Sequence, residues 1–154
     1  MNMAKDDIKE KPVLMSIRPR WLNRILRGEK TVEVRKTFPQ TTYLPFRVLL
    51  YETTGPTDVP WMDEDGHAIW KGQGMIIGEC MCDDIYDIKR TESGHERKYD
   101  EAMDSLSNAE LSEYLGECAG YGWHLTDVKV YETPVSIKKY GLNRPPQSWR
   151  YIEA

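Results

Sequence analysis

Five segments with strand character organise this chain, and they constrain its fold more than any other feature of the sequence. They are residues 13–18, 31–36, 46–53, 74–82 with an extension toward residue 88, and 121–137. The segment 31–36 alternates Val32 and Val34 with polar residues, a period of two that is typical of a strand with one buried and one polar face. The segment 121–137 is rich in aromatic and β-branched residues. We expect it to end or to bulge at Pro134, because proline donates no hydrogen bond to a ladder.

Two stretches have the spacing of amphipathic helices. The first begins at Pro19, which suits the first turn of a helix, and ends before Gly28, which we expect to cap it. Its apolar residues recur at helical spacing and are Trp21, Leu22, Ile25 and Leu26. The second is the acidic stretch 91–118, which we expect to be helical and in which Ser107 and Glu110 have the spacing of a capping box. Its core-facing stripe consists of Leu106, Leu111, Tyr114 and Leu115.

The order of these elements predicts an α+β fold. In it a small β-barrel, mixed but mostly antiparallel, closes on itself and carries flanking helices. The chain has 154 residues, of which 40% are hydrophobic, enough for one sizeable core, so we expect a single domain over residues 11–154. Residues 1–10 are polar and aperiodic and predict a disordered tail. Residues 54–73 are rich in turn formers and predict an insertion with a small hairpin around Asp65 and Gly66. We expect its Trp61 and Trp70 to hold it against the domain.

Several classes of protein are excluded. No apolar run approaches the roughly 20 residues that span a bilayer, so we expect a soluble, cytoplasmic protein without membrane contact. The three cysteines are an odd number, which argues against a disulfide framework and for reduced thiols. Cys80 and Cys82 share a strand face and could recruit His67, His95, His124 or Cys118 to bind zinc. Their spacing is unlike that of a zinc knuckle, so we favour buried thiols and expect neither a metal nor another cofactor. Motifs of serine hydrolases and P-loop proteins are absent from the sequence.

Charge is unevenly distributed along the chain, whose net charge is -4. Residues 11–36 carry eight bases and two acids, whereas residues 52–118 carry 17 acids and five bases. Residues 119–154 again carry more bases than acids. The two basic ends could form a local anion-binding surface, while the acidic middle keeps the molecule soluble. The alternative is that each charged stretch is a solvated face.

The stretch from Gly28 to Arg35 has the most specific chemistry. A helix ends at Gly28, Lys30 follows in the turn, and Glu33 and Arg35 leave one face of the next strand. An arginine fork and a lysine can hold a phosphate, and a glutamate can accept a hydrogen bond from the exocyclic amine of a base. The alternative is an internal salt bridge between these side chains.

These residues resemble a known family. Gly28, Lys30, Glu33 and Arg35 match the GxKxxExR motif of ASCH domains, which are members of the PUA-like superfamily. Three further segments are similar to the small bacterial and prophage branch of that family, namely Ser16 to Leu26, Tyr121 to Leu125 with Asp127, and Arg144 to Trp149. The resemblance implies a PUA-like β-barrel with helices over its openings and a cleft beside the motif that engages RNA or a modified nucleoside.

Two activities are known among such domains. One branch removes the acyl group of N4-acetylcytidine with the motif lysine, a threonine three residues later and a downstream glutamate. Here the lysine position is Lys30, and Glu33 occupies the threonine position. Another branch cuts single-stranded RNA. The resemblance therefore leaves open whether this chain is an amidohydrolase, a ribonuclease or a binding protein.

We carry three functional hypotheses forward. In the first, single-stranded RNA or an extruded nucleobase binds beside the motif, with Glu33 at a base edge and Trp123 at a base face. The residues expected to meet phosphate are Arg18, Arg20, Lys30, Arg35 and Lys36. In the second, Lys30 is a catalytic base or nucleophile and Glu33 the acid or proton shuttle. In the third, the acidic residues 83–117, including Asp100, Glu101 and Asp104, bind a basic host protein.

Overall fold

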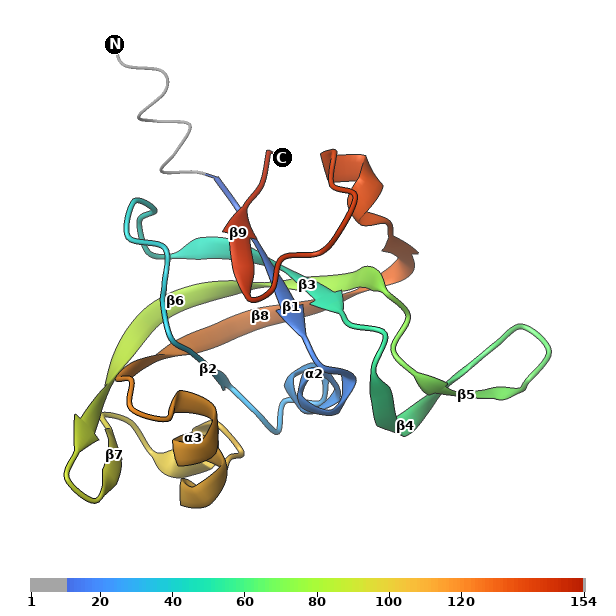
Figure 1. Cartoon of the computed structure of the whole chain (residues 1–154). Helices are drawn as coiled ribbons and strands as arrows, with labels where there is room; N and C mark the ends of the chain where they lie inside the picture. The colour runs from blue at the N-terminus through green and yellow to red at the C-terminus, as the bar shows by residue number, and fades with distance from the viewer. Residues whose placement is uncertain (1–10, 154) are drawn as a thin grey trace, which may run out of the picture.

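A computed structural model of the chain describes residues 11–153 (Figure 1). The predicted tail of residues 1–10 lies outside the described residues. The elements of the first half are β1 (Val13–Ile17), α2 (Pro19–Leu26), β2 (Val32–Arg35), β3 (Phe46–Glu52), β4 (Pro56–Met62) and β5 (Ala68–Lys71). Those of the second half are β6 (Met75–Thr91), β7 (Gly94–Arg97), the 3-10 turn η1 (Glu101–Met103), α3 (Asn108–Leu115), β8 (Gly120–Val135), η2 (Ile137–Tyr140) and β9 (Trp149–Tyr151).

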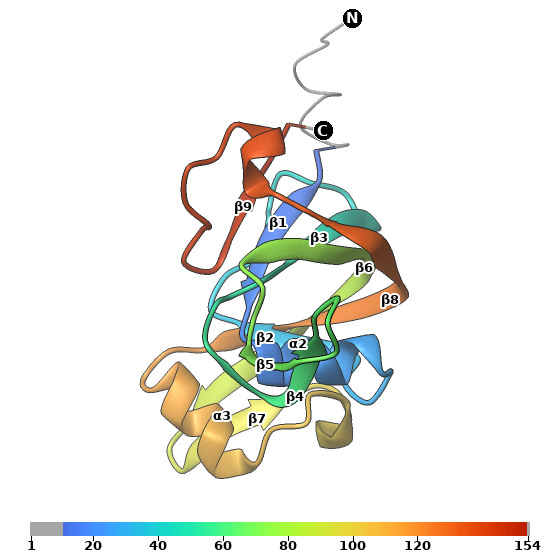
Figure 2. The same cartoon turned by 90° about the vertical axis from the view of Figure 1, so that its right-hand side faces the viewer.

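One curled sheet forms the body of the molecule and confirms the predicted α+β class (Figures 1 and 2). Its strand order is β2-β8-β6-β3-β1-β9, and β7 pairs with β6 outside this path. β1 and β3 are parallel, whereas β2 with β8, β8 with β6, and β6 with β3 are antiparallel. The long strands β6 and β8 pair over most of their length and carry the curvature that makes the sheet a half-barrel.

Side chains join the two edge strands of this half-barrel, β2 and β9. The guanidinium of Arg35, at the end of β2, donates to the carbonyl of Ser16 at 2.9 Å and to the hydroxyl of Ser148 at 3.2 Å. The indole of Trp149, on β9, donates to the hydroxyl of Thr37 at 2.9 Å. Arg35 therefore acts as a cross-link between segments more than 100 residues apart.

The main core lies between the inner face of the sheet and α2. Leu22 and Ile25 of the helix pack against Val48, Trp123 and other residues of the strands. Cys80 and Cys82 belong to this core as buried thiols, and burial raises the pKa of the Cys82 thiol to about 12. Such thiols remain protonated at neutral pH, which suits a packing role.

The predicted insertion is a two-stranded hairpin, β4 and β5, that packs on α2. It is tied to the fully buried carboxylate of Glu52, which accepts from the indole of Trp61 at 2.8 Å and from the amide of Gln73 at 2.6 Å. Burial raises the pKa of Glu52. Gly72 lies so close to this anchor that a Cβ there would stand 1.7 Å from the carbonyl oxygen of Thr53. The expectation for Trp70 is wrong, because its side chain is 59% exposed.

Two other expectations from the sequence are corrected by the structure. The first part of the stretch 91–118 is the β6–β7 hairpin rather than helix, although the capping box of Ser107 and Glu110 is present at the start of α3. β2 has no solvated face, since all four of its residues are buried. Val34 packs under Leu111 and Leu115 of α3, and the opposite, polar face points into the half-barrel. Within residues 11–153, no helix has the length and apolar character needed to cross a membrane.

Candidate functional site

The three charged residues of the motif form one buried cluster. The Lys30 Nζ lies 3.8 Å from one carboxylate oxygen of Glu33, and an Arg35 guanidinium nitrogen lies 3.7 Å from the other. Their side chains are 0%, 9% and 10% exposed in the order Lys30, Glu33, Arg35. The sequence correctly placed these residues together, and the structure shows them in mutual contact, as the salt-bridge alternative expected.

This cluster leaves one polar atom unsatisfied. Glu33 Oε1 accepts a hydrogen bond from the backbone amide of Val34 at 3.2 Å. Glu33 Oε2 is buried and has no hydrogen-bond donor within the described part of the chain. A buried acceptor without a donor costs about 1–3 kcal/mol. The nearest cation to this oxygen is the Arg35 guanidinium at 3.7 Å, which is beyond hydrogen-bond distance.

Local backbone geometry turns Lys30 inward. Gly28, two residues after the end of helix α2, has a φ of +76°, and the amides of Glu29 and Lys30 both donate to the carbonyl of Arg24. The next residue, Thr31, pairs with the carbonyl of Met103. This tight reversal directs the Lys30 side chain across the end of the barrel, where its ammonium group lies 5.3 Å from the ring centre of Trp21.

Burial also changes the chemistry of Lys30. It lowers the pKa of the amine below its usual 10.5, although the carboxylates of Glu33 and Asp104 act in the opposite direction. The amine donates to the backbone carbonyl of Asp104. Lys30 is therefore held in one orientation by a carbonyl, a carboxylate and an aromatic ring, and its neutral form is more accessible than that of a surface lysine.

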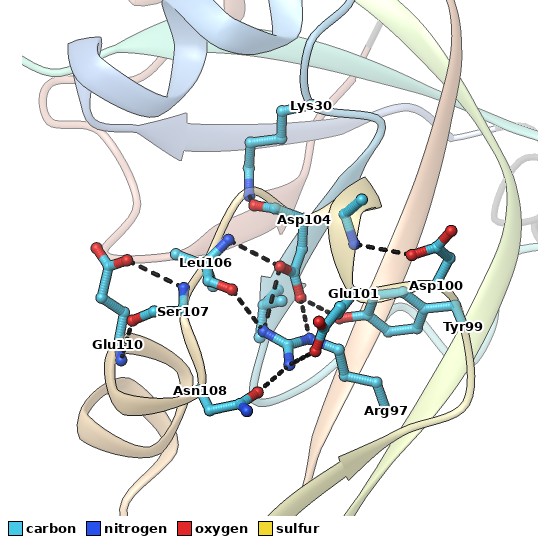
Figure 3. A network of polar contacts seen from close by, with 12 residues as sticks. Lys30, Arg97, Tyr99, Asp100, Glu101, Asp104, Leu106, Ser107, Asn108 and Glu110 are labelled. Carbon is cyan, nitrogen blue, oxygen red and sulfur yellow. Dashed lines mark hydrogen bonds and ion pairs between the residues drawn. The ribbon is translucent and has the colours of Figure 1, made fainter.

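The segment that supplies this carbonyl is fixed by a second polar network (Figure 3). The fully buried carboxylate of Asp104 accepts from the Arg97 Nε at 2.7 Å, from the Tyr99 hydroxyl at 2.7 Å and from the amide of Leu106 at 2.8 Å. The guanidinium of Arg97 also donates to the carbonyl of Leu106 at 2.8 Å. The network holds the turn between β7 and α3 against the end of the Lys30 side chain.

Sequence reasoning missed this network and misplaced one of its members. Asp104 was assigned with Asp100 and Glu101 to an acidic surface, but Asp104 is fully buried whereas the other two are exposed. The spacing of Arg97, Tyr99 and Asp104 has no periodic signature, because they lie in a hairpin end and a 3-10 turn. Asp104 lies among many other acidic residues in the sequence, and nothing in that local pattern indicates that its side chain is buried.

The expected phosphate-binding residues fall into two groups. Lys30 and Arg35 are buried, whereas Arg18, Arg20 and Lys36 are exposed around them. The guanidinium of Arg20 lies 4.5 Å from the ring centre of Trp21 and 4.0 Å from Glu110 of α3, so it bridges the two helices that flank β2. The exposed group therefore forms a basic rim around the buried cluster.

The aromatic residues that are exposed at the rim do not include Trp123, which the sequence predicted to contact a base. Trp123 is 0% exposed, packs against Phe46 and Trp149, and donates its indole N–H to the carbonyl of Thr37, so it has no face for a base. Tyr114 of α3, expected in the core, is 39% exposed and lies under the Lys36 ammonium at 5.5 Å. Its pKa is raised by burial, and the charges of Arg35, Glu33 and Arg18 also act on it, which places it beside the motif.

Two cavities open elsewhere on the described part of the molecule. One of about 430 Å³ is lined by residues that include Phe38, Asp87 and Tyr121, and the other, of about 760 Å³, by residues of the C-terminal segment. Neither includes Lys30, Glu33 or Arg35.

The pKa of Lys30 predicts a specific pH dependence of stability. Because the folded state lowers this pKa, the unfolded chain binds more protons between the folded value and 10.5, and stability rises with pH across that interval. In Lys30→Met this titration is absent. The free energy of unfolding of the wild type should therefore increase relative to that of the variant as pH rises toward 10.5, measured by urea unfolding at a series of pH values. Parallel pH profiles would contradict the buried position of the amine.

The chain is similar to a known domain family and to solved structures. A family model described as the ASCH domain matches residues 15–135. The crystal structure of ASCH from Zymomonas mobilis superposes with a TM-score of 0.66 at 21% identity, covering 93% of this chain and 88% of the other. A tyrosine-to-phenylalanine variant of that protein gives a TM-score of 0.66 at 20% identity, with coverage of 94% and 91%. At these identities the likeness concerns the fold alone. A search of curated proteins found no match.

Proposed function

This chain belongs to the ASCH domain family of the PUA-like superfamily, and from that premise we propose that it binds single-stranded RNA or an extruded, modified nucleobase beside Lys30, Glu33 and Arg35. Phosphate groups contact the rim cations and the base edge contacts Glu33. The observation that carries the proposal is the buried Glu33 oxygen that has no hydrogen-bond donor within residues 11–153. A base offers the missing donor through an exocyclic amine or a ring N–H.

The charge balance of the site supports an anionic ligand. Inside the cluster Lys30 and Arg35 face the single carboxylate of Glu33, since the Asp104 carboxylate is paired with Arg97. The rim adds Arg18 and other exposed cations. Such an excess of positive charge around a low-dielectric interior attracts phosphate and accelerates association with a polyanion.

Aromatic groups at the rim support a nucleobase in particular. Trp21 and Tyr114 lie on the two helices that flank the motif, and each is partly exposed beneath a cation. Stacking of an unpaired base on such a ring contributes about 1–3 kcal/mol. These residues take the role that the sequence had suggested for Trp123.

The test is binding of a fluorescently labelled single-stranded RNA at about 50 and 200 mM salt. We expect measurable affinity at low salt that weakens at high salt, because counterions are released on binding. The double variant Arg18→Ala with Lys36→Ala should bind more weakly and show a shallower salt dependence. The control Lys89→Ala with Lys129→Ala removes two exposed lysines of β6 and β8 and should bind like the wild type. Equal, negligible binding of the wild type at both salt concentrations would remove the proposal.

A second function, hydrolysis of N-acylated nucleosides or cleavage of single-stranded RNA, is favoured by one observation. The lowered pKa of Lys30 makes a neutral amine accessible as a base or nucleophile, with Glu33 beside it to move a proton. Incubation of the wild type and Lys30→Met with N4-acetylcytidine and with single-stranded RNA distinguishes the two functions. Turnover by the wild type alone would establish catalysis, and turnover by neither would leave a binding protein.

A further inference from the structure

The C-terminal segment forms a groove that lies outside the residues matched by the family. The cavity of about 760 Å³ is lined by Lys11 and by residues between Tyr140 and Glu153, including Arg144 and Arg150. The family match ends at residue 135. The superposition on ASCH from Zymomonas mobilis covers 93% of this chain and so extends past residue 135 into the segment that forms the groove.

The groove is cationic in a molecule whose net charge is negative. Residues 133–152 contain four basic side chains and no carboxylate. Arg144 and Arg150 are both exposed and line the cavity, and η2 adds two exposed lysines next to it, Lys138 and Lys139. The one carboxylate of the lining, Glu153, is paired with Lys11 at 2.6 Å. The arginines therefore carry uncompensated charge toward the cavity.

Aromatic side chains in the same lining are held in fixed positions. The Trp149 indole donates to the Thr37 hydroxyl at 2.9 Å, and the Tyr151 hydroxyl lies 2.7 Å from that of Thr41. The two rings pack edge to face with centroids 5.5 Å apart. Both rings are partly buried against the main core, and Arg150 leaves the opposite face of β9, so only the exposed part of each ring reaches the groove. Aromatic surface near positive charge is the combination that single-stranded nucleic acids require.

The segment that forms one wall of the groove also contacts a residue of the motif. Ser148, between Pro146 and Trp149 of the lining, accepts from the Arg35 guanidinium through both its hydroxyl and its carbonyl. The carbonyl of Pro146 accepts from the Ser16 hydroxyl at 2.7 Å, and Ser16 also binds Arg35 through its carbonyl. One wall of the groove is therefore the same segment that fixes Arg35.

We propose that this groove, defined by Arg144, Arg150, Tyr140 and Trp149, binds the phosphodiester backbone of the nucleotides that flank the one bound at the motif. This inference rests on the proposed function, because it concerns the path of the same single strand. An acidic peptide shares the negative charge of such a strand but not its stacking bases, and the aromatic lining favours the nucleic acid.

The test compares labelled RNA of about 12 and about three nucleotides, since single-strand-binding sites commonly cover between about 4 and 16 nucleotides. We expect Arg144→Glu with Arg150→Glu to bind the longer RNA roughly ten-fold more weakly and to lower the slope of log affinity against log salt by about 1.4, or 0.7 per lost phosphate contact. Affinity for the shorter RNA should change little. The control Lys71→Glu with Lys89→Glu alters net charge equally at two exposed lysines of β5 and β6 that do not line the groove, and should leave both affinities near those of the wild type.

Each outcome separates this inference from the proposed function. If the wild type binds RNA and the groove variant binds the longer RNA equally well, the groove inference is overturned and the proposed function stands. If the control weakens binding as much as the groove variant, net charge alone explains the effect and the inference is again overturned. If the wild type binds a polyglutamate peptide and the groove variant does not, while both bind RNA equally, the groove would be assigned to an acidic protein partner instead. A parallel titration with DNA of the same length shows whether the strand must carry 2′-hydroxyls.

Discussion

Replacing Asp104 with asparagine should lower the free energy of unfolding by about 3–5 kcal/mol, the cost of removing one partner of a buried ion pair. Arg97 would keep its ion pair with Glu101, but that carboxylate is 71% exposed and 3.7 Å away. The Asp104 carboxylate is fully buried and bound to Arg97, whose side chain is only 6% exposed. It also accepts from Tyr99 and from the amide of Leu106, and the asparagine amide cannot accept all of these bonds at once. Urea unfolding at neutral pH measures the difference.

The control for this prediction is Glu113→Gln, which removes an exposed carboxylate of α3 and should change stability by less than about 0.5 kcal/mol. If Asp104→Asn were equally mild, the network in Figure 3 would contribute little. The turn that positions Lys30 would then have to be held by other contacts.

Replacing Arg35 with alanine has the second large expected effect, again about 3–5 kcal/mol of stability, and it should also abolish binding of single-stranded RNA. The substitution leaves the Glu33 carboxylate without its nearest guanidinium and the Ser16 carbonyl without a donor. It also removes the guanidinium bonds to Ser148, and with them one of the side-chain links between the two edges of the half-barrel. Unfolding and RNA titration are measured on the same preparation.

Arg35→Lys distinguishes the effect of the guanidinium hydrogen bonds from the effect of the positive charge. Lysine keeps the charge but lacks the planar fork that reaches both Ser16 and Ser148. It should recover part of the stability and little of the RNA affinity. Arg27→Ala is the matched control, since Arg27 is an exposed arginine that follows α2 and pairs with exposed Glu29, and such pairs contribute about 0–1 kcal/mol. A fully stable, RNA-binding Arg35→Ala protein would contradict the cross-link.

Local signals in the sequence were sufficient for most elements. Pro19 and Gly28 bracket α2, and Ser107 with Glu110 marks the start of α3, because caps depend on residues only a few positions apart. The motif residues also follow from local spacing, since alternate residues of a strand share a face. Burial of that face does not. It depends on Ser16 and Ser148, which reach Arg35 only in the folded chain.

Aromatic residues show the same limit. Trp123 and Trp70 both lie on strands of the structure, β8 and β5, yet Trp123 is fully buried and Trp70 is largely exposed. Which face of a strand is inside depends on the curvature of the sheet and on the elements that cover it, and neither is encoded in a short window. The replacement of Trp123 by Trp21 and Tyr114 at the candidate site could be found only from the structure.

The most direct test of RNA binding at the motif is a nuclear magnetic resonance titration of labelled protein with a short single-stranded RNA. The backbone amide of Val34, which donates to Glu33, and the indole N–H of Trp21 report on the two sides of the site. We predict that both signals shift as RNA is added and that neither shifts in Glu33→Gln at the same RNA concentration. Saturating RNA that leaves both signals in place while moving those of other surfaces would contradict the account.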